Sequence, residues 1–312
     1  MAQTLKEHLS ELGVEEGLSS IFLDMAKASK RIREVISLRE MVKGGETNAT
    51  GDVQSSLDVK SQQIIAETVD QNEHVCAHLS EECEELRTCK ATGTYFVSYD
   101  PYDGGSVGDA NITVGSIFGV WSHPPVIGDP AGKNLVAAAY SLWGPGLVFA
   151  FGTKEHGIFW YEYDGTDFIL IGPLNFDVGN QHTSVFGPSD ITSMQYSPSY
   201  QALFNYMLAS KVRLRYAGAM VTDTHHILMR GGAFWYPSSK KKPEGHLRLM
   251  YECAPLGFLV KVAGGQAVNS KGVDILDTVI ENWHQRTPVM FVSPAYAEEA
   301  IRLFTEIGKE VS

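Results

Sequence analysis

Apolar residues recur at helical spacing near the N-terminus of the chain. The positions that fall every three or four residues are Leu18, Ile21, Met25, Ala28, Ile32 and Val35. This spacing is typical of a helix with one buried face, and the run 61–69 predicts the next helix. No apolar run in the sequence is long enough to span a membrane.

Short apolar runs bounded by turn residues then predict a sheet. We expect strands at 74–79, 95–97, 112–121, 147–151, 158–163 and 168–171. The frequent turn residues between the later runs favour a mixed or mostly antiparallel sheet. The segment Ala131–Leu142 is predicted to be a helix.

The second half of the chain alternates helical and strand patterns. We expect helices at 200–210, 221–229, 251–263 and 295–308. The expected strands are 212–216, 233–236 and 288–292. A boundary near Gly172–Gln181 divides the chain into an N-terminal half, 1–175, and a C-terminal half, 176–312.

Carboxylate side chains gather where two of the predicted strands end. Glu81 and Glu82 follow the strand 74–79, and Asp100 and Asp103 follow the strand that begins at Tyr95. Sheets place ligands at strand ends, and four carboxylates brought together would repel one another without cations. Such oxygens suit Mg²⁺, so the pattern predicts two or more divalent ions. The alternative is a polar hairpin turn capped by an aspartate.

Two further features bear on this site. Glu252 stands near the start of an apolar helix, where a carboxylate is costly unless a metal ion or a partner such as Arg248 compensates its charge. The glycines that follow Asp103 allow the backbone to approach a ligand, and the turn amides can cradle a phosphate.

Composition limits the partners. The chain has 312 residues and a formal net charge of −12, which argues against nucleic acid and anionic membranes. The four cysteines include no Cys-x-x-Cys pair, so we expect reduced thiols and a cytoplasmic protein. The first thirteen residues lack the apolar segment of a signal peptide, which agrees with that location.

Several ordered blocks carry a family resemblance: GDVQSSLDV, LSEE, DPYDGGS, VGSIFGVW, LRYAGAMVTD, WYPSSKKKPEGHLRLMYEC and HQRTPVMFVSP. From Gly51 to Ser293 the chain resembles the sugar bisphosphatases, which include fructose-1,6-bisphosphatase and sedoheptulose-1,7-bisphosphatase. The resemblance implies an α/β (α+β) fold layered α-β-α-β-α, of the kind shared with inositol monophosphatases. It also implies hydrolysis of the 1-phosphate of a ketose bisphosphate with Mg²⁺, or Mn²⁺ in its place, and a homodimer or homotetramer.

The resemblance assigns residues one at a time. The implied metal ligands are Glu81, Glu82, Asp100, Asp103, Glu252 and the carbonyl of Tyr102. The acids implied to act in catalysis are Asp58 and Glu82, which position or deprotonate the attacking water, and Asp52, close to the metals. The 1-phosphate residues are Gly104, Gly105, Ser106 and Arg248. Those for the distal phosphate and the sugar are Arg215 from a neighbouring subunit, Tyr216, Tyr236 and Met220.

Two positions depart from the family pattern. His246 stands where a lysine usually binds the distal phosphate, which makes that contact dependent on pH. Gly105 replaces a serine or threonine, so a hydroxyl is lost unless Ser106 substitutes for it.

The substrate is the last question. Fructose bisphosphatases usually carry an Asn-Glu-Gly-Tyr block, and the equivalent region here, which contains VFGPSD, lacks it. We therefore favour sedoheptulose 1,7-bisphosphate, with fructose 1,6-bisphosphate or both sugars as the alternative. A non-catalytic sugar-phosphate-binding protein would explain His246 and Gly105, and an inositol-type monophosphatase would leave Arg215, Tyr216 and Tyr236 unexplained.

Overall fold

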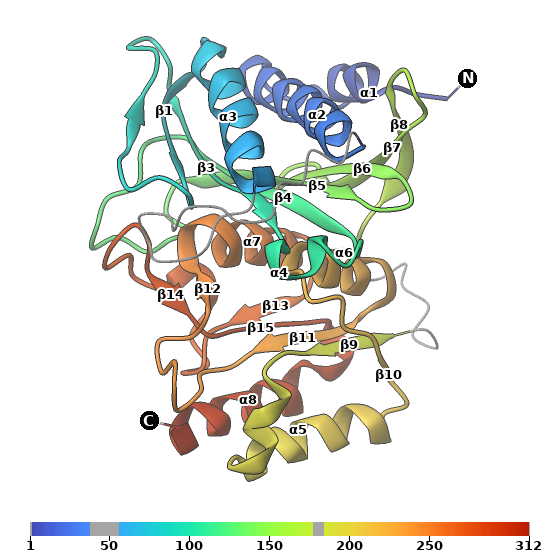
Figure 1. The fold of residues 1–312 in the computed structure, drawn as a ribbon, viewed down its shortest axis with the longest axis vertical. Coiled ribbons are helices and arrows are strands. Elements are labelled where there is room, and N and C mark those ends of the chain that lie inside the picture. Colours follow the sequence, from blue (N-terminus) through green and yellow to red (C-terminus); the bar gives the residue numbers. More distant parts are fainter. Residues whose placement is uncertain (1, 38–55, 177–183, 312) are drawn as a thin grey trace.

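The chain folds into five layers, α-β-α-β-α (Figure 1). A computed structural model describes residues 2–37, 56–176 and 184–311. An outer layer of three helices covers an eight-stranded sheet, a middle layer of helices separates this sheet from a five-stranded one, and two helices cover the far side. The layered fold that the sequence predicts is confirmed. No helix within the described ranges has both the length and the apolar character needed to cross a membrane.

The outer helices follow the predicted apolar stripe. They are α1 (Leu5–Leu12), α2 (Glu16–Ser37) and α3 (Ser56–Gln71). Helix α1 begins at a capping box between Thr4 and Glu7 and ends at Gly13, whose φ of 69° favours glycine. The apolar face of α2 is buried against the sheet, as its spacing predicts.

The large sheet is mixed, as expected. Its strands are β1 (Val75–Ser80), β2 (Arg87–Thr88), β3 (Tyr95–Asp103), β4 (Val114–Trp121), β5 (Leu135–Trp143), β6 (Leu147–Thr153), β7 (Gly157–Tyr163) and β8 (Phe168–Pro173). They lie in the order β2-β1-β3-β4-β5-β6-β7-β8. Strands β1 and β3 pair in parallel and the other neighbours pair antiparallel, so the ends of β1 and β3 meet at one edge.

The predicted helix over Ala131–Leu142 is wrong, because this segment contains strand β5. Its central alanines, Ala137, Ala138 and Ala139, are completely buried. Ala138 belongs to the core beneath the sheet, and its two neighbours belong to the core under α1–α3. A strand buried on both faces loses the polar alternation that marks a half-exposed strand, and tertiary packing overrides the helix propensity of alanine.

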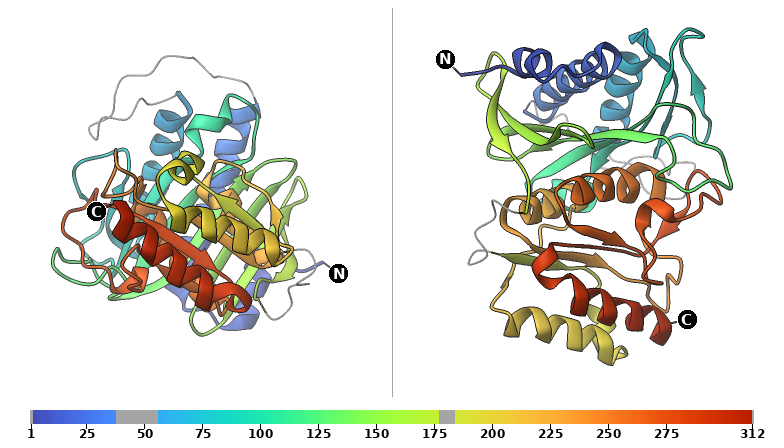
Figure 2. Two further views of the ribbon diagram at one scale, coloured as in Figure 1. Left: turned by 90° about the horizontal axis from the view of Figure 1, so that it is seen from below. Right: turned by 180° about the vertical axis from the view of Figure 1, so that it is seen from behind.

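The second sheet has the order β10-β9-β11-β15-β13. Its strands are β9 (Val185–Pro188), β10 (Arg213–Leu214), β11 (Gly232–Tyr236), β13 (Gln266–Val268) and β15 (Val289–Val292). The predicted strand 212–216 is only two residues long, because it forms an exposed edge. Helices α5 (Pro198–Ala209) and α8 (Ala297–Val311) lie side by side on its outer face (Figure 2).

The middle layer joins both halves of the chain. It contains α6 (Met220–Arg230), the π-helical turn η3 (Leu249–Cys253) and α7 (Ala254–Val262). The largest core cluster takes side chains from both sheets, including Ile117 and Phe291, with Leu256 of α7 between them. Because the halves share this core, the division at residue 175 stays a prediction about folding units. The remaining short elements are α4 (Gly105–Gly108), β12 (Leu247–Arg248), β14 (Arg286–Thr287), η2 (Ile191–Gln195), η4 (Ile275–Asp277) and η5 (Pro294–Tyr296).

Candidate active site

Strand β3 carries two of the predicted acids, Asp100 and Asp103. The strand runs through to Asp103 instead of ending at Asp100, and its register with β4 shifts between the two residues. Pro101 stands at this irregularity, a position where sheets tolerate the missing N–H of proline. The Asp100 carboxylate accepts a hydrogen bond of 2.8 Å from the amide of Tyr102.

Glu252 reaches the same place from the middle layer. It lies in the π-helical turn η3, a widened turn of a kind often found at functional sites. Asp100, Asp103 and Glu252 each offer one carboxylate oxygen within 4.8 Å of the others. All three residues are buried, and we call them the acid cluster.

Burial and mutual repulsion make the acid cluster electrostatically costly. Burial, followed by the charge of Glu81, raises the pKa of Asp100 and of Glu252 well above the ordinary range. Burial raises the pKa of Asp103 to about 6, against hydrogen bonds that include one of 2.6 Å from the amide of Val221 in α6. A divalent cation would turn these repulsions into attractions, so hard oxygen ligands in this arrangement fit a metal ion.

Arg248 holds the fourth acid at the edge of this cluster. Its Nε lies 3.3 Å from Oε1 of Glu81, and both side chains are largely buried. Its backbone amide donates a 2.6 Å hydrogen bond to Glu252. The sequence leaves open a salt bridge between Arg248 and Glu252, and the structure adds an ion pair between Arg248 and Glu81. The guanidinium therefore lies at the edge of the acid cluster.

The turn after Asp103 requires glycine. Gly104 has φ 101°, and a Cβ there would lie 2.8 Å from atoms of both Ala219 and Val114. The one-turn helix α4 follows with Gly105 and Ser106, which are exposed. A Cβ at Gly105 would lie 3.7 Å from the Asp58 carboxylate, so Asp58, in the first turn of α3, borders this turn.

The remaining predicted residues lie in different places. The amide of Glu82 donates to Ser80, and its charge, after burial, raises the pKa of Cys83. The structure thus places Glu82 at the margin of the acids. Met220 is buried at the start of α6, beside Asp103, while Arg215 is exposed. Asp52 lies outside the described residues.

A second group of residues lies beside the acid cluster. The rings of Tyr236 and His246 stack with centroids 4.5 Å apart, and the Tyr216 hydroxyl donates to Ser189 over 3.1 Å. Ser189 also lies close enough to Tyr236 to lower the pKa of that tyrosine. Partial burial raises the pKa of both tyrosines, with smaller contributions from nearby acids, Asp103 for Tyr216 and Glu252 for Tyr236. We call Ser189, Tyr216, Tyr236 and His246 the distal cluster.

Sequence reasoning missed two residues of this region. Ser189 directly follows strand β9 and carries no motif of its own. Asp223 accepts hydrogen bonds from the amides of Ala217 (2.9 Å) and Gly218 (3.3 Å), and so fixes the loop that follows Tyr216. Burial raises the pKa of Asp223 to about 7. Asp223 ends the block LRYAGAMVTD, where a lone aspartate after Thr222 gives no signal of its own.

Most of the chain matches known proteins. Residues 3–173 match the model of the fructose-1-6-bisphosphatase N-terminal domain, and residues 180–305 match that of its C-terminal domain. Class 1 fructose-1,6-bisphosphatase of Campylobacter concisus is 34% identical over 279 residues, covering 88% of this chain and 94% of that protein. The Campylobacter curvus enzyme is 34% identical over 298 residues, covering 95% and 96%.

Solved structures agree with the fold. Leishmania major fructose-1,6-bisphosphatase in its holo form aligns with a TM-score of 0.87 at 30% identity, over 99% of both chains. A Toxoplasma gondii protein assigned provisionally as a sedoheptulose-1,7 bisphosphatase aligns with a TM-score of 0.85 over 99% of both chains. Its 24% identity supports the fold alone.

The matches and the buried acids define a class of protein, the metal-dependent sugar bisphosphatases, which are phosphoric monoester hydrolases. Within that class, the chain belongs to the fructose-1,6-bisphosphatase family.

Proposed function

We propose that the protein removes the 1-phosphate of sedoheptulose 1,7-bisphosphate, giving sedoheptulose 7-phosphate and phosphate, with Mg²⁺ as its metal and Mn²⁺ as a substitute. One observation carries the proposal: three buried carboxylates within 4.8 Å of one another adjoin a distal cluster of phosphate-binding residue types. The first group suits a metal-assisted phosphoryl site. The second suits the far end of a bisphosphate.

The acids near the acid cluster would bind the metal ions and activate the attacking water. Glu81 and the acid cluster would hold the ions, with Glu82 and the Tyr102 carbonyl as further ligands. Bound Mg²⁺ supplies charge neutralisation for the phosphoryl group and acidifies water. Asp58, beside the Gly104–Ser106 turn, would orient and deprotonate the attacking water, with Glu82 and Asp52 as the other acids of this role.

The phosphates need donors at both ends. The 1-phosphate would take the amides of Gly104, Gly105 and Ser106 together with the planar fork of Arg248. Its approach would draw Arg248 away from Glu81 and leave that carboxylate to a metal. Tyr216, Tyr236 and His246 would bind the distal phosphate, and Met220 would contact the sugar between them.

The sequence supports the longer sugar, because the region that contains VFGPSD lacks the Asn-Glu-Gly-Tyr block that fructose bisphosphatases usually carry. Fructose 1,6-bisphosphate is the second candidate substrate, and the names of the bacterial relatives favour it. The test is phosphate release from both bisphosphates in parallel, with Mg²⁺. We expect kcat/KM to be at least about tenfold higher for the sedoheptulose substrate, a difference of about 1.4 kcal/mol in transition-state binding. A higher kcat/KM for fructose 1,6-bisphosphate would favour that substrate, and equal values would favour an enzyme that acts on both sugars.

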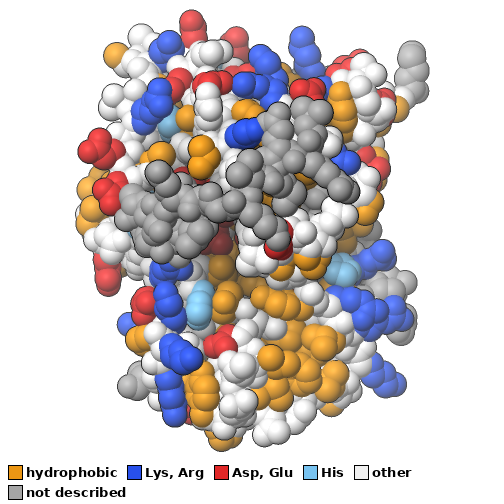
Figure 3. Space-filling model, in the orientation of Figure 1, with side chains coloured by type: hydrophobic (Ala, Val, Ile, Leu, Met, Phe, Trp, Pro, Cys, Tyr) orange, Lys and Arg blue, Asp and Glu red, His pale blue; other side chains and the backbone are white. Residues whose placement is uncertain are grey.

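Self-association is part of the proposal. Ile191, Leu208, Leu214 and Tyr216 are exposed apolar side chains from one segment. Hydrophobic side chains gather on the lower half of the face in Figure 3, where α5 and β10 lie in Figure 1. A patch of this kind is typical of a subunit interface, and Arg215, next to it in the sequence, would reach a neighbouring distal cluster in a homodimer or homotetramer.

His246 gives a separate prediction about pH. Its Nε2 is buried without a hydrogen-bond partner among the described residues, which suits an incoming phosphate oxygen. Burial lowers the pKa of His246, while the charges of Asp190 and Glu244 raise it and those of Lys242 and Arg286 lower it. The free protein therefore holds neutral His246 at neutral pH. Bisphosphate binding must add a proton, so KM should rise with pH.

The variant His246→Lys checks this prediction. Lysine is charged throughout the neutral range, so KM should fall about threefold or more above pH 7 and lose most of its pH trend. His123→Lys, at an exposed position outside both clusters, is the matched control. Identical KM profiles for wild type and His246→Lys would remove His246 from the distal-phosphate site.

A further inference from the structure

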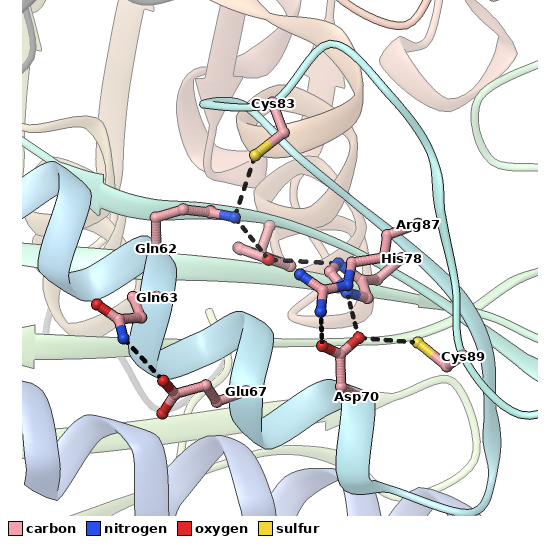
Figure 4. Close-up of polar contacts among 9 residues, drawn as sticks. Gln62, Gln63, Glu67, Asp70, His78, Cys83, Arg87 and Cys89 are labelled. Atoms are coloured by element: carbon pink, nitrogen blue, oxygen red, sulfur yellow. Dashed lines mark hydrogen bonds and ion pairs between the residues drawn. The ribbon is translucent and has the colours of Figure 1, made fainter.

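Asp70, His78 and Cys89 come together away from the acid cluster. Asp70 lies near the end of α3, His78 in β1, and Cys89 directly after β2. Each offers one ligand atom within 4.8 Å of the other two. Oδ1 of Asp70 lies 3.1 Å from Nε2 of His78 and 3.5 Å from Sγ of Cys89 (Figure 4). Three elements thus present one oxygen, one nitrogen and one sulfur to a common point.

These separations suit a tetrahedral transition metal. Zn²⁺ binds nitrogen and oxygen at about 2.0 Å and sulfur at about 2.3 Å. Tetrahedral angles then place nitrogen and oxygen ligands about 3.3 Å apart, and sulfur and oxygen ligands about 3.5 Å apart. Mg²⁺ prefers six oxygen ligands and binds imidazole and thiolate groups poorly. The donor set therefore selects a different ion from the acid cluster.

His78 is prepared as a ligand. It is buried, and burial lowers its pKa, so the imidazole is neutral at neutral pH. Its second nitrogen, Nδ1, lies 3.3 Å from the Tyr99 hydroxyl. A partner on the other ring nitrogen is the usual way in which proteins fix the orientation and tautomer of a metal-binding histidine.

An arginine covers the open side of the group. Nη2 of Arg87 lies 2.5 Å from Oδ2 of Asp70, and the Arg87 side chain is 61% exposed. An exposed guanidinium that compensates the Asp70 charge can move into water when a cation takes its place. The departure of Arg87 therefore gives both an entry path and a fourth position for water.

We infer that Asp70, His78 and Cys89 form a second metal site, for Zn²⁺ or a similar transition ion, on the opposite face of β3 from the acid cluster. Tyr99, which contacts His78, packs in the core under α1–α3, and the side chain of the next residue, Asp100, points the other way. Binding replaces the Cys89 proton by the cation and releases that proton to water. Because burial and the charge of Asp70 raise the pKa of Cys89 to about 12, the thiol keeps its proton until the cation arrives.

The site is connected to the catalytic acids. The Tyr99 hydroxyl accepts from Gln62 at 3.3 Å, and Gln62 also donates to Cys83 at 3.2 Å and accepts from Ser80 at 2.5 Å. Ser80 and Cys83 flank Glu81 and Glu82. A bound cation would join the end of α3 to β1 and β2, and so stabilise the scaffold that carries these glutamates.

Co²⁺ is the direct probe, because a cobalt–thiolate bond gives a charge-transfer absorption band that oxygen ligands lack. Chelator-stripped protein is titrated with Co²⁺ in excess Mg²⁺, which occupies the acid cluster. We expect one equivalent to produce the band, and Zn²⁺ to displace it. Cys89→Ser should abolish the band, whereas Cys253→Ser, beside the acid cluster, and Cys83→Ser should retain it.

Two further variants keep the test informative if Cys89→Ser folds poorly. Asp70→Asn should keep the band but weaken Zn²⁺ affinity at least about tenfold in competition with a chromophoric chelator. Arg87→Ala should tighten the affinity, because it removes the group that the cation displaces. No band in the wild type, a band that survives in folded Cys89→Ser, or unchanged Zn²⁺ affinity in Asp70→Asn would each overturn the inference.

Discussion

Replacing Glu252 by glutamine, or Asp103 by asparagine, is expected to lower kcat at least about 1000-fold, or about 4 kcal/mol, while the protein stays folded. Each change removes one charge from three carboxylates within 4.8 Å of one another, so the site loses affinity for the ions that neutralise the phosphoryl group. Stability should not fall, since the lost charge is one that its buried neighbours repel. Steady-state kinetics and thermal unfolding of each variant measure both outcomes.

The matched control is Glu306→Gln. Glu306 pairs with Lys309 on the exposed side of α8, far along the chain from the acid cluster, and its loss should leave kcat unchanged. If folded Glu252→Gln retains more than about a tenth of the wild-type turnover, Glu252 is not a metal ligand.

The metal-free protein is expected to lose thermal stability as pH rises from 6.5 to 8.5. Folding raises the pKa of Asp223 to about 7 and those of Asp100 and Glu252 well above their ordinary values, whereas the unfolded chain titrates near pH 4. The folded state therefore binds more protons, and the stability these groups provide at low pH is lost as pH passes their folded pKa values. Each unit by which a folded-state pKa exceeds its unfolded-state value corresponds to about 1.4 kcal/mol of folding free energy.

The pH window separates carboxyl groups from histidines. Burial lowers the pKa of His225 to about 4. The contribution of His225 to folding stability therefore rises as pH increases towards 6.5 and does not change at higher pH. Within the window we expect Tm to fall by several degrees in chelator and to recover with Mg²⁺, which binds only the folded state. In Glu252→Gln, the Tm measured in chelator should depend less on pH than it does in the wild type. A Tm in chelator that stays constant or increases over this range would contradict the account of the acid cluster.

The local sequence predicts most of the elements but not the packing that overrides propensity. The apolar stripe of α2 follows from its helical spacing, and strands β6–β8 follow from short apolar runs bounded by turn residues. The segment Ala137–Ala139 misleads, because burial on both faces of the sheet removes any periodic signal. Strand β2, two exposed residues, has no sequence signature at all.

The site is partly predictable for a similar reason. Asp100 and Asp103 follow an apolar run, so their place at the edge of the sheet can be inferred, and the structure brings both together with Glu252. The ion pair of Arg248 with Glu81 depends on folding, which brings β12 close to the residue that follows β1, and sequence spacing gives no sign of this contact. Ser189 and Asp223 act through contacts formed only after folding, and a lone serine or aspartate gives no pattern to find.

The central claim is that metal ions at the acid cluster direct hydrolysis to the 1-phosphate. Phosphorus NMR of the products formed from sedoheptulose 1,7-bisphosphate by chelator-stripped protein, before and after Mg²⁺ is added, tests it most directly. The account predicts no hydrolysis without metal and, with Mg²⁺, sedoheptulose 7-phosphate and inorganic phosphate as the only products. Hydrolysis in the presence of chelator, or release of the 7-phosphate, would contradict it.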